Sequence, residues 1–288
     1  MAGALRLLVE EELSQTVDPR VRAMAEAIAS KHGRASRAVL FYGSCLREKQ
    51  LDGLMLDFYL IVSDYRAAYD KAWLARANAL IPPNVFPFEH DGVAAKYAVL
   101  SEADFHRLNG PETRNVSVWA RFAQPARLAW AEDDAARSKA VAAVARAAPT
   151  LLAAAGSIDE EEPLDWWRRA FALTYSAELR AERKGRAGSV VDSDRERYER
   201  FSLPAMAAIP TGAAKGGRWA RRRLEGKLLS VLRLAKASAT YAGGADYIVW
   251  KINRHAGTKF ELTDWQRRHP LIAAISLLPR LLRSGAVR

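Results

Sequence analysis

The most constraining feature of this chain is a pair of apolar runs at residues 37–42 and 56–62. The stretch that contains most of both runs, residues 39–62, reads VLFYGSCLREKQLDGLMLDFYLIV. The first run, at residues 37–42, predicts a buried strand that ends at Gly43. The second, at residues 56–62, is rich in β-branched and aromatic residues and predicts another strand. We therefore expect a strand, a Gly-Ser turn, a loop and a second strand, with the carboxylate of Asp57 at its start.

The Gly-Ser turn and Asp57 together have the chemistry of a site for a nucleoside triphosphate and its metal ion. Gly43 has no Cβ, so its backbone can approach a phosphate closely, and Ser44 adds a hydroxyl and an amide donor to an anion-binding turn. A charged residue in a buried strand is unfavourable unless it is paired or metal-bound. An ordinary turn would explain Gly-Ser alone, but the combination with Asp57 favours a nucleotidyltransferase.

The sequence offers several carboxylates as the second metal ligand. Nucleotidyltransferases commonly carry another carboxylate two residues after the first, on the same face of the strand, and here that position holds Tyr59. Asp52 is the candidate replacement, with a solvated loop carboxylate as the alternative. Asp64 lies past the far end of the strand, about 20 Å away along an extended chain. Asp91 is explained by its place in an Asp-Gly turn.

Two basic residues are candidate partners of the triphosphate. Lys96 interrupts an apolar strand, AAKYAVLS, and either faces inward to neutralise phosphates or faces solvent. Arg121, in VWARFAQPARL, has the same two interpretations. Lys96 belongs to a predicted hairpin, in which residues 84–90 and 93–100 flank the Asp-Gly turn.

The remaining periodicity is mostly helical. Helices are predicted at residues 21–32, 65–80, 101–108 (with a capping box at Ser101 and Asp104), 133–155, 164–184, 194–201, 219–242 and 247–255, and a further strand at residues 127–130. The first half is thus α/β and the second half helical. An acidic linker, SIDEEEP at residues 157–163, predicts a boundary between domains at 1–156 and 157–245, followed by a basic C-terminal region at 246–288.

Composition narrows the class of protein. The 288 residues, 50% of them hydrophobic, are enough for two domains with proper cores. The formal charge of +11 predicts an anionic partner, either nucleic acid or anionic lipid. Cys45 is the only cysteine, which excludes an internal disulfide and a cysteine-rich zinc site, and the five histidines show no metal-ligand spacing.

The sequence also bears on location. The N-terminus carries three successive glutamates, which fits neither a secretory signal nor a transit peptide. No run reaches the roughly 18 apolar residues of a membrane-spanning helix. We therefore expect a soluble or peripheral protein, and the richness in Ala and Arg indicates a bacterial cytoplasm.

Six segments, taken in order, resemble one family, the mitochondrial-type phosphatidate cytidylyltransferases, also called translocator-maintenance proteins. They are FYGSCLR, MLDFYLIVSD, DGVAAKYAVLS, ARFAQPARL with the alanine-rich helix after it, LTYSAELR and LAKASATYAGG, and they are spread over residues 39–255. This family likewise lacks the second carboxylate of the strand. The resemblance implies a nucleotidyltransferase-fold domain with a mixed sheet, followed by a mostly helical, winged-helix-like domain that closes the active site.

The resemblance also implies a reaction. Enzymes of this family make CDP-diacylglycerol and pyrophosphate from CTP and phosphatidic acid, with Mg²⁺ or another divalent cation, in phospholipid biosynthesis. A bacterial member would act at the inner face of the cytoplasmic membrane as a peripheral protein, with no stable nucleic-acid partner.

Roles for individual residues follow from the same resemblance. Gly43 and Ser44 would hold the triphosphate and Asp57 the metal, with Asp52 as a second metal ligand. The basic positions that would face the nucleotide are Lys96, Arg121 and Arg180. Glu178 stands where the family carries an aspartate, and is either a catalytic carboxylate and possible missing ligand or part of a salt bridge on a helix surface.

Two basic segments are candidates for membrane contact. Residues 218–236, RWARRRLEGKLLSVLRLAK, form a cationic amphipathic pattern, and WQRRHPLIAAISLLPRLLRSGAVR at residues 265–288 combines Trp265, apolar residues and arginines. The C-terminal segment is the stronger candidate of the two. Two other functions remain open: a nucleotidyltransferase that acts on RNA or a small polar acceptor, and a non-catalytic membrane or nucleic-acid adapter on a nucleotidyltransferase scaffold.

Overall fold

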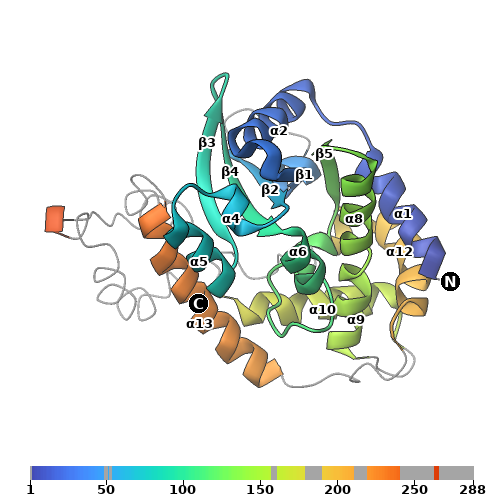
Figure 1. Ribbon diagram of the computed structural model, residues 1–288. Coiled ribbons are helices and arrows are strands. Elements are labelled where there is room, and N and C mark those ends of the chain that lie inside the picture. The colour runs from blue at the N-terminus through green and yellow to red at the C-terminus, as the bar shows by residue number, and fades with distance from the viewer. Residues whose placement is uncertain are drawn as a thin grey trace.

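A computed structural model describes residues 2–48, 51, 54–156, 161–178, 190–210, 219–240 and 263–265. The protein is of the α/β class, with helices packed on both faces of one five-stranded mixed sheet (Figure 1). The strands are β1 (Ser36–Tyr42), β2 (Leu56–Val62), β3 (Asn84–His90), β4 (Val93–Ser101) and β5 (Ala126–Ala131), in the order β3-β4-β2-β1-β5. All five predicted strands are confirmed, with boundaries that differ by at most one residue.

The β3–β4 hairpin forms as its turn residues predict. Asp91 and Gly92 have φ of 49° and 74°, and two successive positive φ angles are what the tight turn of a right-twisted hairpin requires. This accounts for Asp91 as a turn residue. Pro87 lies within β3, which is tolerated because β3 is the edge strand of the sheet.

The pairing of the strands puts three polar residues in a row. β1 pairs antiparallel with β2 and β5, β2 pairs parallel with β4, and β4 pairs antiparallel with β3. In this register Tyr42 of β1 is opposite Asp57 of β2, which is opposite Lys96 of β4. Because directly opposed residues project from the same face of a sheet, the three side chains lie side by side.

Alternation along the strands gives the sheet two apolar faces. Phe58 and Leu60 of β2 belong to one core cluster, whereas Tyr59 and Ile61 belong to the other. The first face is covered by α2 (Pro19–His32), α4 (Tyr65–Ala68) and α5 (Ala72–Leu80). The second, larger cluster is built with α1 (Ala2–Ser14), α6 (Glu102–Leu108), α7 (Trp119–Phe122), α8 (Asp134–Val144), α9 (Ala147–Ala155), α10 (Pro163–Ala177), α12 (Arg195–Ala207) and α13 (Trp219–Thr240).

Two helices predicted as continuous are each divided. The prediction for residues 65–80 is wrong at Tyr69, which is extended (φ −134°, ψ 128°) and separates α4 from α5. Asp64 caps α4, accepting hydrogen bonds from two backbone amides. The prediction for residues 133–155 is wrong between α8 and α9, where Pro149 lacks the N–H that a continuous helix needs.

The N-terminal helix α1 was not predicted. Leu5, Val9 and Leu13 recur along one face of it and are buried. Glu12, from the run of three glutamates, is also buried and forms an ion pair with Arg197 of α12. Helix α1 is therefore joined to a helix almost two hundred residues away in the sequence.

The hydrophobic core continues across the predicted linker. Trp167 and Phe171 of α10 and Tyr198 of α12 pack against one another and belong to the same cluster as Leu40 and Tyr59. The division into domains stays a prediction. The predicted helix at 247–255 and most of the region 246–288 lie outside the described residues.

Helix α13 is held against the rest of the protein on one side. At Gly226 a Cβ would lie 2.1 Å from the carbonyl oxygen of Ala177, so only glycine allows α13 to cross the end of α10 this closely. Further along, the Lys236 ammonium donates hydrogen bonds to Ile81 O and to Pro83 O, the latter at 2.8 Å. Within the described helices, none is long and apolar enough to cross a membrane.

The Lys236 contact predicts a dependence of stability on pH. Burial, followed by repulsion from Arg233, lowers the pKa of Lys236 from 10.5 to about 7. Above pH 7 the folded protein releases this proton before the unfolded chain does, so the free energy of unfolding should rise between about pH 7 and pH 10. Lys236→Met should remove this rise. Urea denaturation of both proteins across that range tests it, and equal slopes would contradict the assignment.

Candidate nucleotide-binding site

Gly43 ends β1 in a conformation and an environment that only glycine fits. Its φ is 99°, which side-chain-bearing residues rarely adopt. A Cβ at this position would lie 3.0 Å from Asp57 Oδ2 and 3.3 Å from Asp57 Cβ. The Gly-Ser turn and the strand carboxylate, which are separated in sequence, are thus in direct contact. Ser44 follows at once and begins the short helix α3 (Ser44–Glu48).

Asp57 is paired with a lysine. Lys96 Nζ lies 2.7 Å from Asp57 Oδ1, and the two side chains are 26% and 18% exposed. Lys96 therefore faces inward, and the alternative that it faces solvent is wrong. Asp57 Oδ1 is buried, and its close partner is the Lys96 ammonium. An ionised carboxylate has about four acceptor sites on its two oxygens, so Asp57 can bind a further group beside Lys96.

Tyr59 fills the place of the expected second carboxylate with an aromatic ring. It is 2% exposed, and its ring centroid lies 5.2 Å from those of Tyr42 and Phe122. These contacts make the position part of the core. A carboxylate there would lose this packing and would have to be desolvated.

Arg121, on α7, lies on the same side of the sheet as Asp57. Burial acts to lower the pKa of its guanidinium, whereas the side chains of Tyr59 and Tyr42 act to raise it. The carboxylates of Glu178 and Asp57 raise it further, so that the pKa lies above its ordinary value. Arg121 therefore stays charged beside the two carboxylates.

Glu178 lies just beyond the end of α10. The prediction that this helix continues to residue 184 is wrong at this point, because α10 ends at Ala177 and Glu178 is extended (φ −112°, ψ 152°). Its side chain is buried, at 8% exposure, so the alternative of a salt bridge on a helix surface is also wrong. Its carboxylate acts to raise the pKa of both Arg121 and Arg233, so it lies within electrostatic range of both guanidinium groups.

Arg233 was not among the predicted site residues. The sequence predicts only that residues 218–236, which include Arg233, form a basic amphipathic helix. In the structure Arg233 lies on the inner face, seven residues after Gly226 and so on the same side of the helix. A glycine at this helical spacing is the one local signal that could have identified the inward-facing arginine.

Of the two predicted metal ligands, Asp57 is among the described residues. Among the described residues, no group of three or more His, Cys, Asp or Glu side chains could hold a metal ion. Asp52 and Arg180 lie outside the described residues. Mg²⁺ is often bound by one or two carboxylates together with substrate phosphates and water. Asp57, which has carboxylate lone pairs beyond the one directed at Lys96, fits a Mg²⁺ ion that arrives with a triphosphate.

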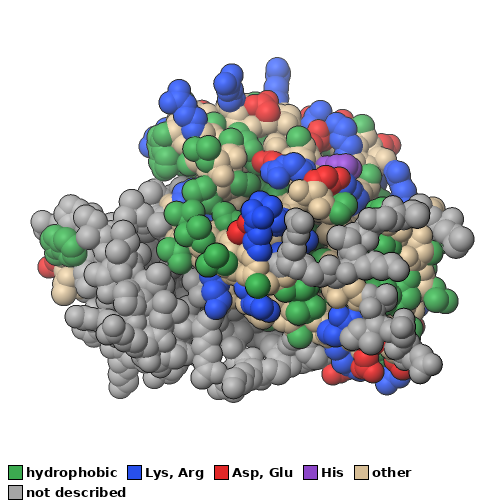
Figure 2. Space-filling model, turned by 90° about the horizontal axis from the view of Figure 1, so that it is seen from below, with side chains coloured by type: hydrophobic (Ala, Val, Ile, Leu, Met, Phe, Trp, Pro, Cys, Tyr) green, Lys and Arg blue, Asp and Glu red, His purple; other side chains and the backbone are tan. Residues whose placement is uncertain are grey.

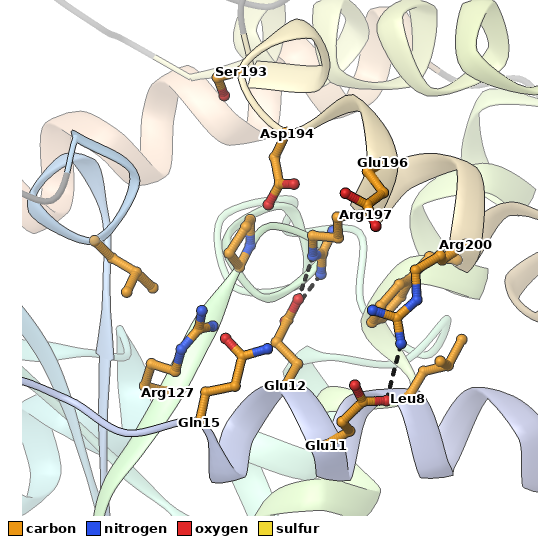
Figure 3. Close-up of a pocket in the computed structure, with 13 residues that line it drawn as sticks. Leu8, Glu11, Glu12, Gln15, Arg127, Ser193, Asp194, Glu196, Arg197 and Arg200 are labelled. Carbon is orange, nitrogen blue, oxygen red and sulfur yellow. Dashed lines mark hydrogen bonds and ion pairs between the residues drawn. The ribbon is translucent and has the colours of Figure 1, made fainter.

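A cavity of about 360 Å³ lies elsewhere, between α1, α12 and the start of β5 (Figure 3). Two of its arginines already have acidic partners: Arg197 pairs with Glu12, and Arg200 with Glu11. Its lining does not include Asp57 or the residues around it. We therefore place the candidate site at the Gly43–Asp57 contact and not in this cavity.

Comparison of the sequence with models of known protein families finds no match, and neither does comparison with curated proteins.

Substitution of Gly43 should damage the site specifically. Gly43→Ala adds backbone strain on the order of 1–3 kcal/mol and also displaces Asp57. Gly92→Ala is the matched control, because it adds similar backbone strain at a position where no atom lies within 4 Å of the new Cβ. Both variants should lose stability in thermal denaturation, and only Gly43→Ala should lose nucleotide binding in calorimetric titrations. Equal binding by the two variants would contradict a role for the Gly43–Asp57 contact.

Proposed function

We propose that this protein is a metal-dependent nucleotidyltransferase that transfers CMP from CTP to phosphatidate, giving CDP-diacylglycerol and pyrophosphate. The observation that carries the proposal is the contact of Gly43 with Asp57, extended by the Asp57–Lys96 ion pair. The resemblance of the ordered segments to phosphatidate cytidylyltransferases supports the choice of CTP and phosphatidate.

The architecture supports a nucleotidyltransferase fold. The proposed triphosphate turn comes directly after β1, the metal-binding carboxylate begins the adjacent β2, and the sheet is mixed. Helices α10 and α13 contribute to the side of the sheet that Asp57 faces, with Glu178 and Arg233 beside Arg121. This suits a helical second domain that closes the active site, which we propose is winged-helix-like.

The charges at the site support a polyanionic substrate. Lys96 and Arg121 face the same region as Asp57 and are partly shielded from water. Cations in such a place bind phosphate oxygens more strongly than they would in bulk water, because the local dielectric constant is lower. Backbone amides at the Gly-Ser turn would add donors to the triphosphate.

The proposed reaction needs little general-base catalysis. The second pKa of a phosphate monoester is about 6, so the phosphatidate nucleophile is already anionic near neutral pH. One of its oxygens attacks the α-phosphorus of CTP, and the bond to the bridging oxygen of pyrophosphate breaks. The protein has to align the two phosphates and neutralise charge. Lys96 and Arg121 would stabilise the departing pyrophosphate, and Glu178 would hold Arg121 in place.

The divalent cation would be held by Asp57 and by the phosphates, with Asp52 as the proposed second protein ligand. When bound, it supplies positive charge at the reacting phosphates.

The outer face of α13 supports a lipid acceptor. Leu224, Leu228 and Leu232 recur at helical spacing and are 73%, 58% and 39% exposed. Arg223 and Lys227 form an exposed cationic row alongside them. Figure 2 shows hydrophobic and basic side chains interspersed on the described surface, seen from below. Such a face suits an anionic bilayer, so we propose a peripheral location on the inner face of the bacterial cytoplasmic membrane.

Asp57→Asn should abolish activity while the protein stays folded. Loss of the metal-binding carboxylate removes several kcal/mol of transition-state stabilisation, so turnover should fall on the order of 100-fold or more. The measurement is Mg²⁺-dependent pyrophosphate release from CTP with phosphatidate vesicles. Glu89→Gln, an exposed change on β3, is the control and should keep wild-type turnover. Near-normal turnover by Asp57→Asn would refute the proposal.

The same assay separates the competing functions. Wild-type protein should prefer CTP to ATP, GTP and UTP, and phosphatidate to RNA or small polar acceptors. Transfer to RNA, together with a gel shift that weakens as salt rises, would indicate the RNA-directed alternative. Membrane binding without pyrophosphate release from any nucleotide would indicate an adapter.

Leu228→Glu should weaken membrane binding. Transfer of a leucine side chain from water is worth about 1.5–3 kcal/mol, so partitioning into vesicles that contain phosphatidate should fall about ten-fold or more. Leu7→Glu is the matched control, since Leu7 is similarly exposed, at 67%, on α1. Vesicle flotation measures both. An equal loss in the two variants, or none in Leu228→Glu, would exclude α13 as the contact.

A further inference from the structure

Arg233 holds an unusual position for an arginine of a basic surface helix. Its Nε donates a hydrogen bond to Pro82 O at 2.9 Å, and its Nη1 donates to Ser117 Oγ at 2.8 Å. Its Nη2 is buried and has no hydrogen-bond partner within the described residues. A buried donor without a partner is unfavourable, so this nitrogen calls for an explanation.

A second arginine is held by the same serine. Arg121 Nη1 donates to Ser117 O at 3.0 Å, so the two guanidinium groups are attached to one residue. Ser117 is itself fixed, because its Oγ donates to Asn115 Oδ1 at 2.9 Å. The arrangement keeps two like charges near each other in a partly buried place.

The electrostatics of Arg233 are consistent with this geometry. Burial lowers the pKa of Arg233, while Glu178 and Tyr59 act to raise it and Arg121 lowers it again. The carboxylate of Glu178 offsets part of the repulsion between the arginines. With Lys96 included, three cations and the carboxylates of Asp57 and Glu178 meet on this side of the sheet, which leaves a net positive charge.

Phosphate is the ligand class that this arrangement suits best. Guanidinium groups present donors in a planar fork that matches two oxygens of a phosphate. A phosphate beside Arg121 and Arg233 would relieve the repulsion between them and would give Arg233 Nη2 an acceptor. A neutral ligand could accept the hydrogen bond, but it would leave the repulsion between the arginines unchanged.

We propose that Arg233 is a third cation of the phosphate-binding site, which contacts the part of the triphosphate that leaves as pyrophosphate. This inference rests on the proposed nucleotidyltransferase function. Because Arg233 belongs to α13, the phosphate site is complete only when this helix is docked on α10 and on the loop at residues 81–83.

A purely structural role is the competing explanation, and Lys236 provides the control for it. Arg233 and Lys236 both anchor α13 to the carbonyl groups of residues 81–83. Only Arg233 also bonds to Ser117 beside Arg121. Loss of either side chain weakens the docking of the helix, but only loss of Arg233 removes a phosphate contact.

Calorimetric titration of the full chain with inorganic pyrophosphate and Mg²⁺ tests the inference. We expect Arg233→Gln to raise the Kd for pyrophosphate about ten-fold or more, since a hydrogen bond to a charged group is lost, whereas Lys236→Met should keep a Kd close to that of the wild type. Arg233→Lys, which keeps the charge but not the planar fork, should give an intermediate Kd. This variant decides the question if Arg233→Gln does not fold, as judged by circular dichroism.

The outcomes separate this inference from the proposed function. If the wild type binds pyrophosphate and the folded Arg233 variants bind it equally well, Arg233 is not a phosphate ligand, although the proposed function stands. An equal loss in Lys236→Met would show that Arg233 only docks the helix. If the wild type binds neither pyrophosphate nor CTP, the proposed function fails and this inference fails with it.

Discussion

The contact between Gly43 and Asp57 is the constraint on which the rest of the candidate site depends. A Cβ at position 43 would lie only 3.0 Å from an Asp57 carboxylate oxygen, so glycine lets the end of β1 approach the start of β2 closely at this point. The register of the sheet then adds Tyr42 on one side of Asp57 and Lys96 on the other. The pairings β1–β2 and β2–β4 thus set which side chains flank the carboxylate.

The charged groups around this contact come from both halves of the chain. Lys96 lies on β4, Arg121 on α7, Glu178 after α10 and Arg233 on α13. What brings them together is the continuous core beneath them, in which α10 and α12 share a cluster with the sheet. The Glu12–Arg197 ion pair links the N-terminal helix α1 to α12 in the same way. The site therefore depends on packing between the two halves of the protein.

Helix α13 links the two substrates of the proposed reaction. Its inner face carries Gly226, which permits the close approach to α10, and Arg233, which lies beside Arg121. Its outer face carries exposed leucines and cations. One helix can therefore contribute to a phosphate site on one side and meet a lipid surface on the other, which is a reasonable arrangement for an enzyme that joins a soluble nucleotide to a lipid.

The sequence by itself determined the strands, the hairpin turn and the neighbourhood of Gly43, Ser44 and Asp57, because strand periodicity, Asp-Gly and Gly-Ser are local signals. The sequence also identified Lys96 as a candidate, but it left open whether its side chain faces the site or the solvent. A single lysine in a strand has no local preference for either face. Only the tertiary structure decided that Lys96 pairs with Asp57, that Glu178 is buried beyond the end of its helix, and that Arg233 faces the site. Each of these depends on contacts between segments far apart in the sequence, which no local pattern records.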